Sequence, residues 1–368
     1  MAPTLFTPLT VGSLPLSHRV IMAPLTRFRA SDAHVHGDLA VEYYSQRASV
    51  PGTLLITEGT FISPRASGYP NVPGIYNPTQ IEAWKKVTQE VHAKGSFIIL
   101  QLWALGRAAD PETLRKEVGD GCFTSSSAVP MSAGGVESKA LHEEQIWGYI
   151  GDYAEIARNA IKAGFDGVEV HGANGFLIDQ FTQDTCNKRT DDWGGSIEKR
   201  SRFGLEVAKA VVAAVRADRV GVRLSPFSTF QGMKMTHPIP QFSHLIEGLK
   251  GLNLAYLHMV ESRISGDAEM ESTELVDFAL KIWGKISPVL LAGGFQPDSA
   301  SRVLDEYPDS DVAVVFGRQF ISNPDLPFRI KEGLKLTSYD RETFYKPKGP
   351  DGYTDYPFSD EWKTQQRL

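Results

Sequence analysis

One stretch of this chain carries a strand and the turn that follows it: Gly167-Val168-Glu169-Val170-His171-Gly172-Ala173-Asn174-Gly175-Phe176-Leu177-Ile178-Asp179-Gln180-Phe181. Its first four residues form a short apolar run, which is typical of a buried strand. His171 and Asn174 are three residues apart, so one turn of helix after the strand would aim both side chains the same way. The pair predicts two hydrogen-bond donors at the carboxyl end of a strand, suited to a carbonyl oxygen that gains negative charge. Phe176 beside them offers a surface but no proton.

Short apolar runs and helical patterns alternate along the whole chain. Eight candidate strands lie at Arg19–Leu25, Thr53–Thr57, Phe97–Trp103, Gly167–His171, Val220–Leu224, Ala255–Met259, Val289–Ala292 and Val312–Phe316. Helical patterns occupy Tyr149–Ala163 and Leu205–Val215, and the second has an apolar face of Leu205, Ala208, Val211, Val212 and Val215. Thr79-Gln80-Ile81-Glu82, after Asn77-Pro78, has the spacing of a capping box and predicts another helix start. Eight consecutive βα units favour an α/β fold, a single (β/α)8 TIM barrel spanning residues 1–368.

The main rival to this barrel is a doubly wound open sheet, whose dinucleotide site normally has a G-x-G-x-x-G loop after its first strand. The sequence has no such loop, and it has no P-loop, zinc-binding helix or G-x-S-x-G pattern. The segment Arg107–Leu141, rich in Gly, Ser and charge, interrupts the third βα unit without strong periodicity. We expect it to be an excursion over the barrel mouth, either a loop or a lid.

Composition and charge narrow the class of partner. The chain has 368 residues, 42% of them apolar, and a net charge of −6. No basic run interleaved with aromatics suggests nucleic acid, and no stretch approaches the roughly 20 apolar residues needed to cross a bilayer. Cys122 and Cys186 are too few for a disulfide framework and lack metal-ligand spacing, so no metal site is expected. We expect a cytoplasmic protein with a small-molecule partner, and the choice between monomer and homodimer stays open.

In such a barrel, catalytic groups belong to the carboxyl ends of strands and to the loops after them. By that rule the candidates are Pro24-Leu25-Thr26, Glu58-Gly59-Thr60, Gln101-Leu102-Trp103, His171 with Asn174, Arg223, Gly293-Gly294 and Gly317-Arg318. Small residues and an arginine after the last two strands predict a phosphate site, because backbone amides must approach closely and a guanidinium pairs with phosphate oxygens. Each residue alone also has a structural explanation, as a cap, an ion pair or a turn. Their joint order along the barrel favours a binding site.

At these residues the sequence resembles the Old Yellow Enzyme family of FMN-dependent ene-reductases, from about Leu5 to Pro357. The motifs that carry the resemblance stand in family order: Met22-Ala23-Pro24-Leu25-Thr26-Arg27, Gln101-Leu102-Trp103, the stretch His171 to Phe181, Trp193-Gly194-Gly195-Ser196 and Phe316-Gly317-Arg318-Gln319-Phe320-Ile321-Ser322-Asn323-Pro324. The resemblance implies tightly bound FMN, NADPH as the reductant, and an α,β-unsaturated carbonyl compound as the substrate.

The resemblance also implies a role for each candidate residue. Thr26 would donate its hydroxyl to flavin O4, and the ring would have as backbone neighbours Ala23, Pro24 and Gly59. Gln101 would pair with the pyrimidine edge, and Arg223 would lie near N1, where negative charge collects on reduction. The phosphate would be held by Gly293, Gly294, Gly317 and Arg318. The substrate space above the ring would be lined by Tyr69, Trp103, Phe344 and Tyr345.

Phe176 departs from the family pattern, because most of these reductases have Tyr there and use it to protonate the carbon α to the carbonyl. Hydride transfer to the β carbon would survive, since it needs only the flavin, correct placement, and polarisation by His171 and Asn174. One general acid is typically worth ~10²–10⁴ in rate, so its loss prolongs the enolate. Slow protonation by solvent or another hydroxyl such as Tyr345 would give a weak ene-reductase. Bond rotation and return of the hydride would give an isomerase, and a larger substrate would trap the enolate internally.

A closer resemblance bears on this choice. Residues 42–58 and 106–111 resemble the fungal branch of the family that acts on chanoclavine-I aldehyde in ergot alkaloid biosynthesis. In that branch, Tyr at the donor position goes with reduction and Phe with isomerisation, which brings the aldehyde within reach of the substrate's own secondary amine to close an iminium. We therefore favour the isomerase over an NADPH-dependent ene-reductase with another proton donor. A non-redox TIM-barrel lyase would need a Schiff-base lysine, and no strand end named above has one; a flavin-binding protein without catalysis is the remaining alternative.

Overall fold

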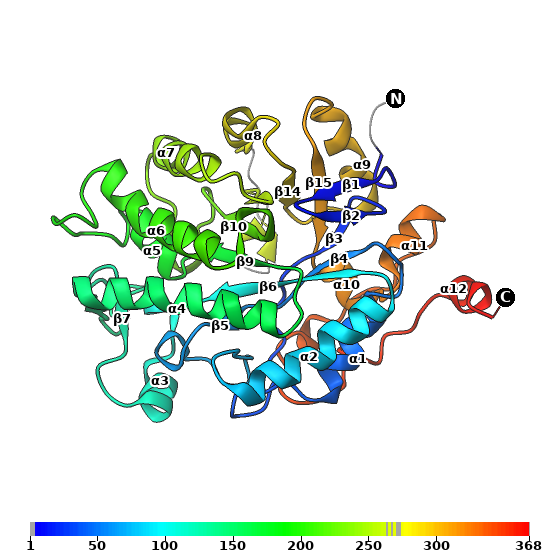
Figure 1. The fold of residues 1–368 in the computed structure, drawn as a ribbon, viewed down its shortest axis with the longest axis horizontal. Helices are drawn as coiled ribbons and strands as arrows, with labels where there is room; N and C mark the ends of the chain where they lie inside the picture. Colours follow the sequence, from blue (N-terminus) through cyan, green and yellow to red (C-terminus); the bar gives the residue numbers. More distant parts are fainter. Residues whose placement is uncertain (1–3, 263, 266–267, 270–273, 368) are drawn as a thin grey trace.

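Parallel strands form a closed barrel at the centre of the computed structural model, which describes residues 4–262, 264–265, 268–269 and 274–367 (Figure 1). The barrel strands are β3 (Val20–Met22), β4 (Leu54–Ile56), β6 (Phe97–Trp103), β9 (Gly167–Gly172), β10 (Val220–Leu224), β11 (Tyr256–Val260), β14 (Val289–Ala292) and β15 (Val312–Phe316). Each pairs in parallel with its neighbours in the order β4, β3, β15, β14, β11, β10, β9, β6, and the pairing of β4 with β6 closes the ring. The predicted (β/α)8 barrel is therefore confirmed, and all eight predicted strands overlap observed ones.

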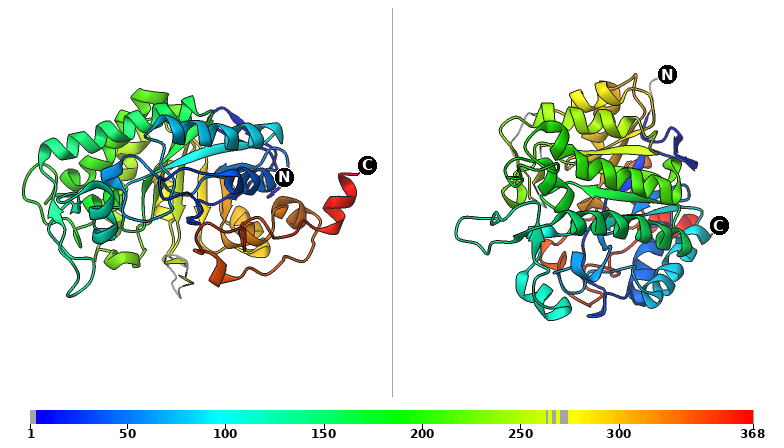
Figure 2. Two further views of the ribbon diagram at one scale, coloured as in Figure 1. Left: turned by 90° about the horizontal axis from the view of Figure 1, so that it is seen from below. Right: turned by 60° about the vertical axis from the view of Figure 1, so that its left-hand side comes forward.

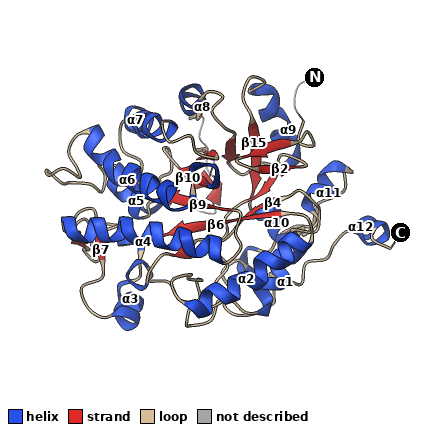
Figure 3. Ribbon diagram, viewed as in Figure 1, coloured by secondary structure: helices blue, strands red, loops and turns tan. Residues whose placement is uncertain are grey.

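Helices surround the barrel, as Figure 3 shows. Their bounds are α1 (Asp38–Arg47), α2 (Pro78–Ala93), α3 (Pro111–Val118), α4 (Glu143–Lys162), α5 (Leu177–Thr182), α6 (Ile197–Val215), α7 (Pro238–Lys250), α8 (Asp277–Trp283), α9 (Pro297–Glu306), α10 (Arg318–Ser322), α11 (Leu326–Lys331) and α12 (Asp360–Gln365). No helix among the described residues is long and apolar enough to cross a membrane.

Three helix starts differ from the sequence prediction, and one is that of α4, which begins at Glu143, six residues before the predicted Tyr149. The cap of α2 is Asn77, whose side chain accepts a hydrogen bond from the Gln80 amide, so the helix begins at Pro78 and Thr79 is already inside it. Proline suits this first position because its missing N–H would have no partner in the helix. The α6 helix begins at Ile197, eight residues before the predicted Leu205, and Ser196 caps it by accepting from the Lys199 amide.

The buried face of α6 also differs in part from the predicted one. Val211 and Val215 are buried as expected, whereas Leu205 and Val212 are only partly buried. Phe203 and Val207 occupy the buried face beside Val211. The buried stripe is therefore rotated from the predicted one and runs through Phe203, Val207 and Val211.

The amino-terminal end of the barrel is covered by a hairpin of β1 (Leu9–Val11) and β2 (Leu14–Leu16). Its apolar side chains pack into the same cluster as the inward-facing Ile21, Leu54 and Leu290. Gly12 sits at the tip with φ +58°, and a side chain there would meet the Asp218 carbonyl oxygen at 2.0 Å. The barrel is thus closed at the end where its strands begin, which leaves the carboxyl end for ligands.

The segment 107–141 has more regular structure than its sequence predicted. It contains α3, capped by the Asp110 side chain, and a small parallel pair of β7 (Thr124–Ser125) with β8 (Lys139–Ala140). Elements this short leave little periodic signal. Arg107 donates to the carbonyl oxygens of Pro130 and Gln231, so the segment is tied to the loop after β10. Three further short strands are β5 (Thr60–Phe61), which pairs with β6, and the antiparallel pair β12 (Ile264–Ser265) and β13 (Ala268–Glu269).

The carboxyl-terminal segment returns to the first βα unit, and α12 extends away from the barrel (Figure 2). Three arginines of the first βα unit hold this segment in place by donating hydrogen bonds to its backbone carbonyl oxygens. Arg27 donates to the oxygens of Phe344 and Gly352, at 3.1 and 2.6 Å, and Arg29 donates to Asp351 O at 2.7 Å. Arg47 donates to Tyr353 O at 3.0 Å. Residues more than 300 positions apart in sequence therefore form one wall.

Candidate active site

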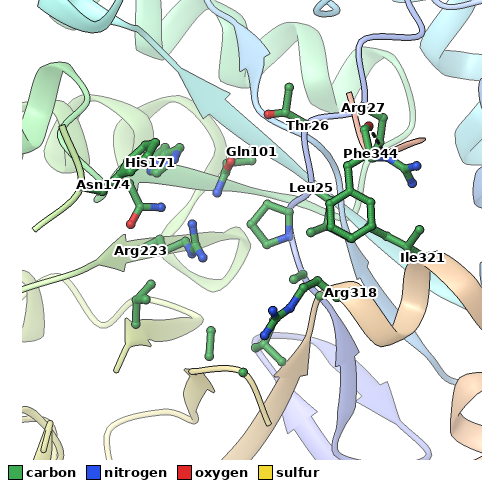
Figure 4. A pocket seen from close by; sticks show the side chains of 18 of the residues that line it. Leu25, Thr26, Arg27, Gln101, His171, Asn174, Arg223, Arg318, Ile321 and Phe344 are labelled. Atoms are coloured by element: carbon green, nitrogen blue, oxygen red, sulfur yellow. Dashed lines mark hydrogen bonds between the residues drawn. The ribbon is translucent and has the colours of Figure 1, made fainter. Parts of the chain in front are cut away.

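A cavity of about 530 Å³ lies at the carboxyl end of the barrel. Its size falls within the range of about 300–1,000 Å³ that is usual for small-molecule and cofactor sites. Figure 4 shows His171 and Asn174 together on one side, Gln101 and Arg223 next to them, and Phe344 with Ile321 on the opposite side. Of the strand-end candidates, Glu58, Thr60 and Leu102 do not line this cavity. All but one of the residues to which the resemblance gave a role do line it. The exception is Gly59.

Gly59 lies behind the cavity wall, against Trp103. A Cβ atom at this position would be 2.5 Å from Cε3 of the Trp103 ring, closer than real Cβ contacts come. The absence of a side chain here therefore allows the indole to lie close against the backbone after β4.

His171 is the last residue of β9 whose side chain points into the barrel. Val168 and Val170 alternate with the inward-facing residues and point outward into the helix layer. The Ala173 amide donates to Nδ1 of His171 at 3.3 Å, so the ring proton belongs on Nε2. Burial, with the nearby Arg223 and His258, holds the pKa of His171 well below its usual value. The ring is therefore neutral, and Nε2–H is its hydrogen-bond donor.

Asn174 reaches the same side of the cavity by a route that the sequence analysis did not predict. No helical turn links it to His171, because α5 begins only at Leu177. Instead Asn174 adopts a left-handed conformation with φ +57°, which asparagine tolerates better than most residues. Its backbone N–H donates to Ser225 Oγ at 2.7 Å. The expectation that the two side chains lie on one side is confirmed, but the helical explanation was wrong.

Phe176 forms an aromatic corner with Trp103 and His171. Its ring centroid lies 4.7 Å from that of Trp103 and 5.0 Å from that of His171, both in edge-on geometry. Tyr69 extends the corner, with its centroid 5.9 Å from that of Trp103. Phe176 is 7% exposed and lines the cavity, so packing against these rings fixes its position while a small part of it remains accessible.

Gln101 and Arg223 bring polar groups to the cavity from β6 and β10. Gln101 Nε2 donates to Glu169 Oε1 at 2.7 Å, which directs the amide oxygen away from Glu169. Arg223 Nε donates to His258 Nε2 at 3.4 Å, which leaves the terminal guanidinium nitrogens for other partners.

Glycines at the ends of β14 and β15 create a shallow cradle beside Arg318. A Cβ atom at Gly293 would lie 2.6 Å from Glu261 Oε2, and Gly294 has φ +69°. Gly317 and Arg318 complete this part of the lining. The missing side chain at Gly293 makes room for the Glu261 carboxyl group, so the groups here that could meet a phosphate are the backbone of Gly294 and Gly317 and the guanidinium of Arg318.

The carboxyl-terminal segment contributes Phe344 and Tyr345 to the opposite wall. Phe344 is buried, whereas Tyr345 is 48% exposed and its ring lies 5.6 Å from that of Phe28. The hydrogen bond from Arg27 to the Phe344 carbonyl, dashed in Figure 4, fixes this wall.

The cavity has further lining residues that the sequence analysis did not propose for the site. They are Arg27, Phe28, Phe230, Gln231, Val260, Ala292, Phe295, Gln296, Val315, Gln319 and Ile321. Several directly precede or follow a proposed residue, so extending each strand-end candidate by a few positions would have found them. Phe230 and Gln231 belong to the long loop after β10, where no local pattern marks them.

Among the described residues that line the cavity, none carries a carboxyl group. The hydroxyl groups in the lining belong to Thr26, Tyr69 and Tyr345. Burial, with smaller contributions from Asp110 and Tyr345, raises the pKa of Tyr69 to about 12. A phenol with that pKa releases its proton less readily than an ordinary tyrosine.

The lining fits FMN in its chemical character. An apolar wall from the β3 loop, an amide from Gln101 and a guanidinium from Arg223 suit the faces and pyrimidine edge of a flavin ring. The glycine cradle with Arg318 suits a phosphate group.

Comparisons with known proteins agree with this architecture. A family model described as NADH:flavin oxidoreductase / NADH oxidase matches residues 4–337. The chain is 59% identical to "Chanoclavine-I aldehyde reductase fgaOx3" of Penicillium roqueforti over 360 residues, 98% of this chain and 97% of that protein. It is 53% identical to "Probable inactive reductase easA" of Epichloe festucae var. lolii, over 99% of this chain and 97% of that one. The crystal structure of Old Yellow Enzyme from Pichia sp. superposes with a TM-score of 0.89 at 45% identity, over 98% of this chain and 95% of that one.

Proposed function

We propose that this chain, which belongs to the NADH:flavin oxidoreductase / NADH oxidase family and is a flavin oxidoreductase of the Old Yellow Enzyme type, isomerises an α,β-unsaturated aldehyde. The aldehyde we propose is chanoclavine-I aldehyde, and the isomerised product then closes to an iminium. The observation that carries the proposal is Phe176, which lies beside His171 and Trp103 and has no proton to give.

We assign the cavity to tightly bound FMN, with NADPH as the reductant. Ala23 and Pro24 would be backbone neighbours of the ring, whereas Gly59, which does not line the cavity, would not touch it. Thr26 and Gln101 would donate to or accept from the polar atoms of the ring. Arg223 would stand at the edge where negative charge collects. The phosphate would be held by Gly293, Gly294, Gly317 and Arg318. On this proposal residues 1–368 form one FMN-binding unit that acts in the cytoplasm, with the 107–141 segment beside its mouth.

When bound, FMN supplies reversible hydride transfer to and from the β carbon of the enal. The residues of the chain decide what the substrate does in between. The Nε2–H of His171 and the side-chain amide of Asn174 would both donate to the aldehyde oxygen. Two such donors stabilise the negative charge that the oxygen gains as the alkene becomes a single bond. Rotation about that bond then changes the alkene geometry once the hydride leaves again.

The lifetime of the enolate depends on how quickly its α carbon is protonated. Phe176 cannot protonate it, and the raised pKa of Tyr69 makes that phenol a weak acid. Slow protonation favours rotation and return of the hydride, with no net redox change. The rearranged aldehyde can then meet the secondary amine of the same molecule and lose water to form an iminium.

Net reduction of the alkene is the second candidate function. The name of the Penicillium relative, a chanoclavine-I aldehyde reductase, favours it, as does Tyr345, which is half exposed at the cavity and open to proton exchange with water. In this case Tyr345 or Tyr69 would protonate the α carbon, and each turnover would consume one NADPH.

The test measures how many product molecules form for each molecule of NADPH consumed. The protein is reduced anaerobically with one equivalent of NADPH, excess chanoclavine-I aldehyde is added, and the products are identified by mass. Many rearranged molecules of unchanged redox state per NADPH support the isomerase, whereas one saturated product per NADPH supports the reductase. A parallel run with NADH tests the choice of reductant.

Phe176→Tyr should convert isomerisation into net reduction and raise the rate of α-carbon protonation by ~10²–10⁴. Tyr69→Phe and Tyr345→Phe are the matched controls, because each removes one phenol from the same cavity. Unchanged products in Phe176→Tyr would contradict the assignment. Loss of residual reduction in either control would identify that tyrosine as the donor instead.

A further inference from the structure

A buried carboxylate and a histidine stand behind the two polar groups that face the cavity. We propose that Glu169 and His258 are positioning residues that fix Gln101 and Arg223 and, by balancing the charge of Arg223, set the reduction potential of the bound flavin. The inference rests on the proposed assignment of this cavity to FMN.

Glu169 is completely buried inside the barrel and accepts hydrogen bonds from the adjacent strand β6 and, across the barrel interior, from β11. Its Oε1 accepts from Gln101 Nε2 at 2.7 Å. Its Oε2 accepts from His258 Nδ1 at 2.8 Å and from the Tyr256 hydroxyl at 3.1 Å. A carboxylate that accepts three hydrogen bonds in a dry interior is held in one orientation, and it holds its donors in turn.

Strand register explains why these side chains meet. Gln101 pairs with Glu169, Glu169 pairs with Gly221, and Gly221 pairs with Tyr256, so these residues form one layer across the barrel. A Cβ atom at Gly221 would lie 2.1 Å from the Tyr256 ring. The missing side chain therefore lets Tyr256 cross the barrel interior to reach Glu169.

The layer nearer the cavity holds Arg223, which pairs with His171 on one side and with His258 on the other. His258 connects the two layers. Its Nδ1 donates to Glu169, and its Nε2 accepts from Arg223 Nε, which always carries a proton. Both ring nitrogens are thereby assigned, and the ring is the neutral tautomer with its proton on Nδ1.

The charges of the group follow from this arrangement. Burial lowers the pKa of His258, and Arg223 lowers it further, so the ring stays neutral despite the adjacent Glu169. Burial alone would raise the pKa of Glu169, but His258, Arg223 and Gln101 together hold it below its usual value. Tyr256 and the neutral His171 add no charge at ordinary pH. Arg223 and Glu169 are left as one cation and one anion joined through a neutral ring.

Because Glu169 balances Arg223, the electrostatic potential in the cavity is less positive than Arg223 alone would make it. A flavin gains negative charge on reduction, so a more positive edge favours its reduced form. Glu169→Gln removes the balancing anion but retains the shape and an acceptor oxygen. The reduction equilibrium should then move toward the reduced flavin by about tenfold, a rise of about 30 mV in the two-electron potential.

Two matched variants separate charge from shape. Glu169→Asp keeps the charge but shortens the reach, so its potential should stay closer to wild type than that of Glu169→Gln. Tyr256→Phe removes one hydrogen bond from the same carboxylate and should leave the potential unchanged. A merely structural role predicts the reverse order, because Gln is the closer isostere of Glu.

His258→Leu provides an independent measurement in case Glu169→Gln does not fold. Without its acceptor, the Arg223 guanidinium is drawn back toward the buried carboxylate and away from the cavity. The potential should therefore fall, opposite in sign to the effect of Glu169→Gln.

The experiment is an anaerobic redox titration of each purified holoprotein against a reference dye, followed by flavin absorbance. Opposite shifts in Glu169→Gln and His258→Leu, with no shift in Tyr256→Phe, are the expected result. Equal potentials in all variants would overturn the inference while leaving the flavin assignment intact. A wild-type protein that purifies without flavin and binds none would instead overturn the proposed function.

Discussion

Asp179 provides the sharpest prediction about stability. It lies in α5, directly after the loop that carries Asn174 and Phe176, and it is completely buried. Its Oδ2 accepts from the Gly175 amide and its Oδ1 from Gln183 Nε2, both at 2.8 Å. Burial outweighs these hydrogen bonds and the nearby Arg107, and raises the pKa of Asp179 from 3.8 to about 7.

The raised pKa makes the folded protein less stable as the pH rises. Between pH 3.8 and about 7, the folded chain holds a proton on Asp179 that the unfolded chain has already released. The free energy of unfolding therefore falls through this interval, by roughly 4 kcal/mol in total at about 1.4 kcal/mol per pH unit. The loss is complete above the folded-state pKa and absent below the unfolded-state one.

Asp179→Asn removes this titration. Relative to the variant, the wild type should lose roughly 3 kcal/mol of unfolding free energy between about pH 5 and about pH 8. The variant also loses one hydrogen bond that the asparagine side chain cannot accept. This loss lowers the free energy of unfolding by the same amount at every pH, so it does not affect the slope of stability against pH. Other groups that titrate, such as His18, are common to both proteins and cancel as well.

The measurement is urea denaturation followed by circular dichroism at several pH values for both proteins. Asp120→Asn is the control, because Asp120 is an exposed carboxylate of the 107–141 segment and should leave the pH slope unaltered. A stability difference between wild type and Asp179→Asn that stays constant across the interval would refute the reasoning.

Two further substitutions test packing at the cavity wall. Gly59→Ala places a Cβ atom 2.5 Å from the Trp103 ring, and overpacking of this kind should cost about 1–3 kcal/mol and shift the tryptophan fluorescence. An unaltered urea midpoint would show that the indole can move freely. Arg47→Met removes the donors to the carbonyl oxygens of Phe320, Ile321 and Tyr353, and leaving these groups buried should cost on the order of 3 kcal/mol or more. Thermal unfolding measures the loss, and partial recovery in Arg47→Lys is expected if the hydrogen bonds rather than the packing are responsible.

The barrel was predictable because each strand is a short apolar run between turns, and all eight runs were found. Two-residue strands such as β5 and β7 were not, since two residues cannot show a period. The position of the α2 cap was also misjudged by two residues, because both Asn77 and Thr79 can accept a hydrogen bond from a backbone amide three positions later.

The site was predictable where its residues adjoin strand ends, as for Gln101, His171 and Arg223. The local conformation was not, because nothing in the sequence distinguishes a left-handed Asn174 from one in a helical turn. The polar group behind the cavity was missed for a different reason. Glu169 sits within an apolar run, and its partners come from strands that meet it only when the barrel closes.

The two ends of the chain meet at the cavity, and this has a consequence for synthesis on the ribosome. Strand β3 pairs with β15, and Arg27 binds the carbonyl of Phe344, so the first contact waits for residue 316 to emerge and the second for residue 344. A nascent chain holds the first strands and their helices with an open seam and no far wall. The cavity is therefore completed late in synthesis, and a protein truncated before Phe344 would fold around a site that is open on one side.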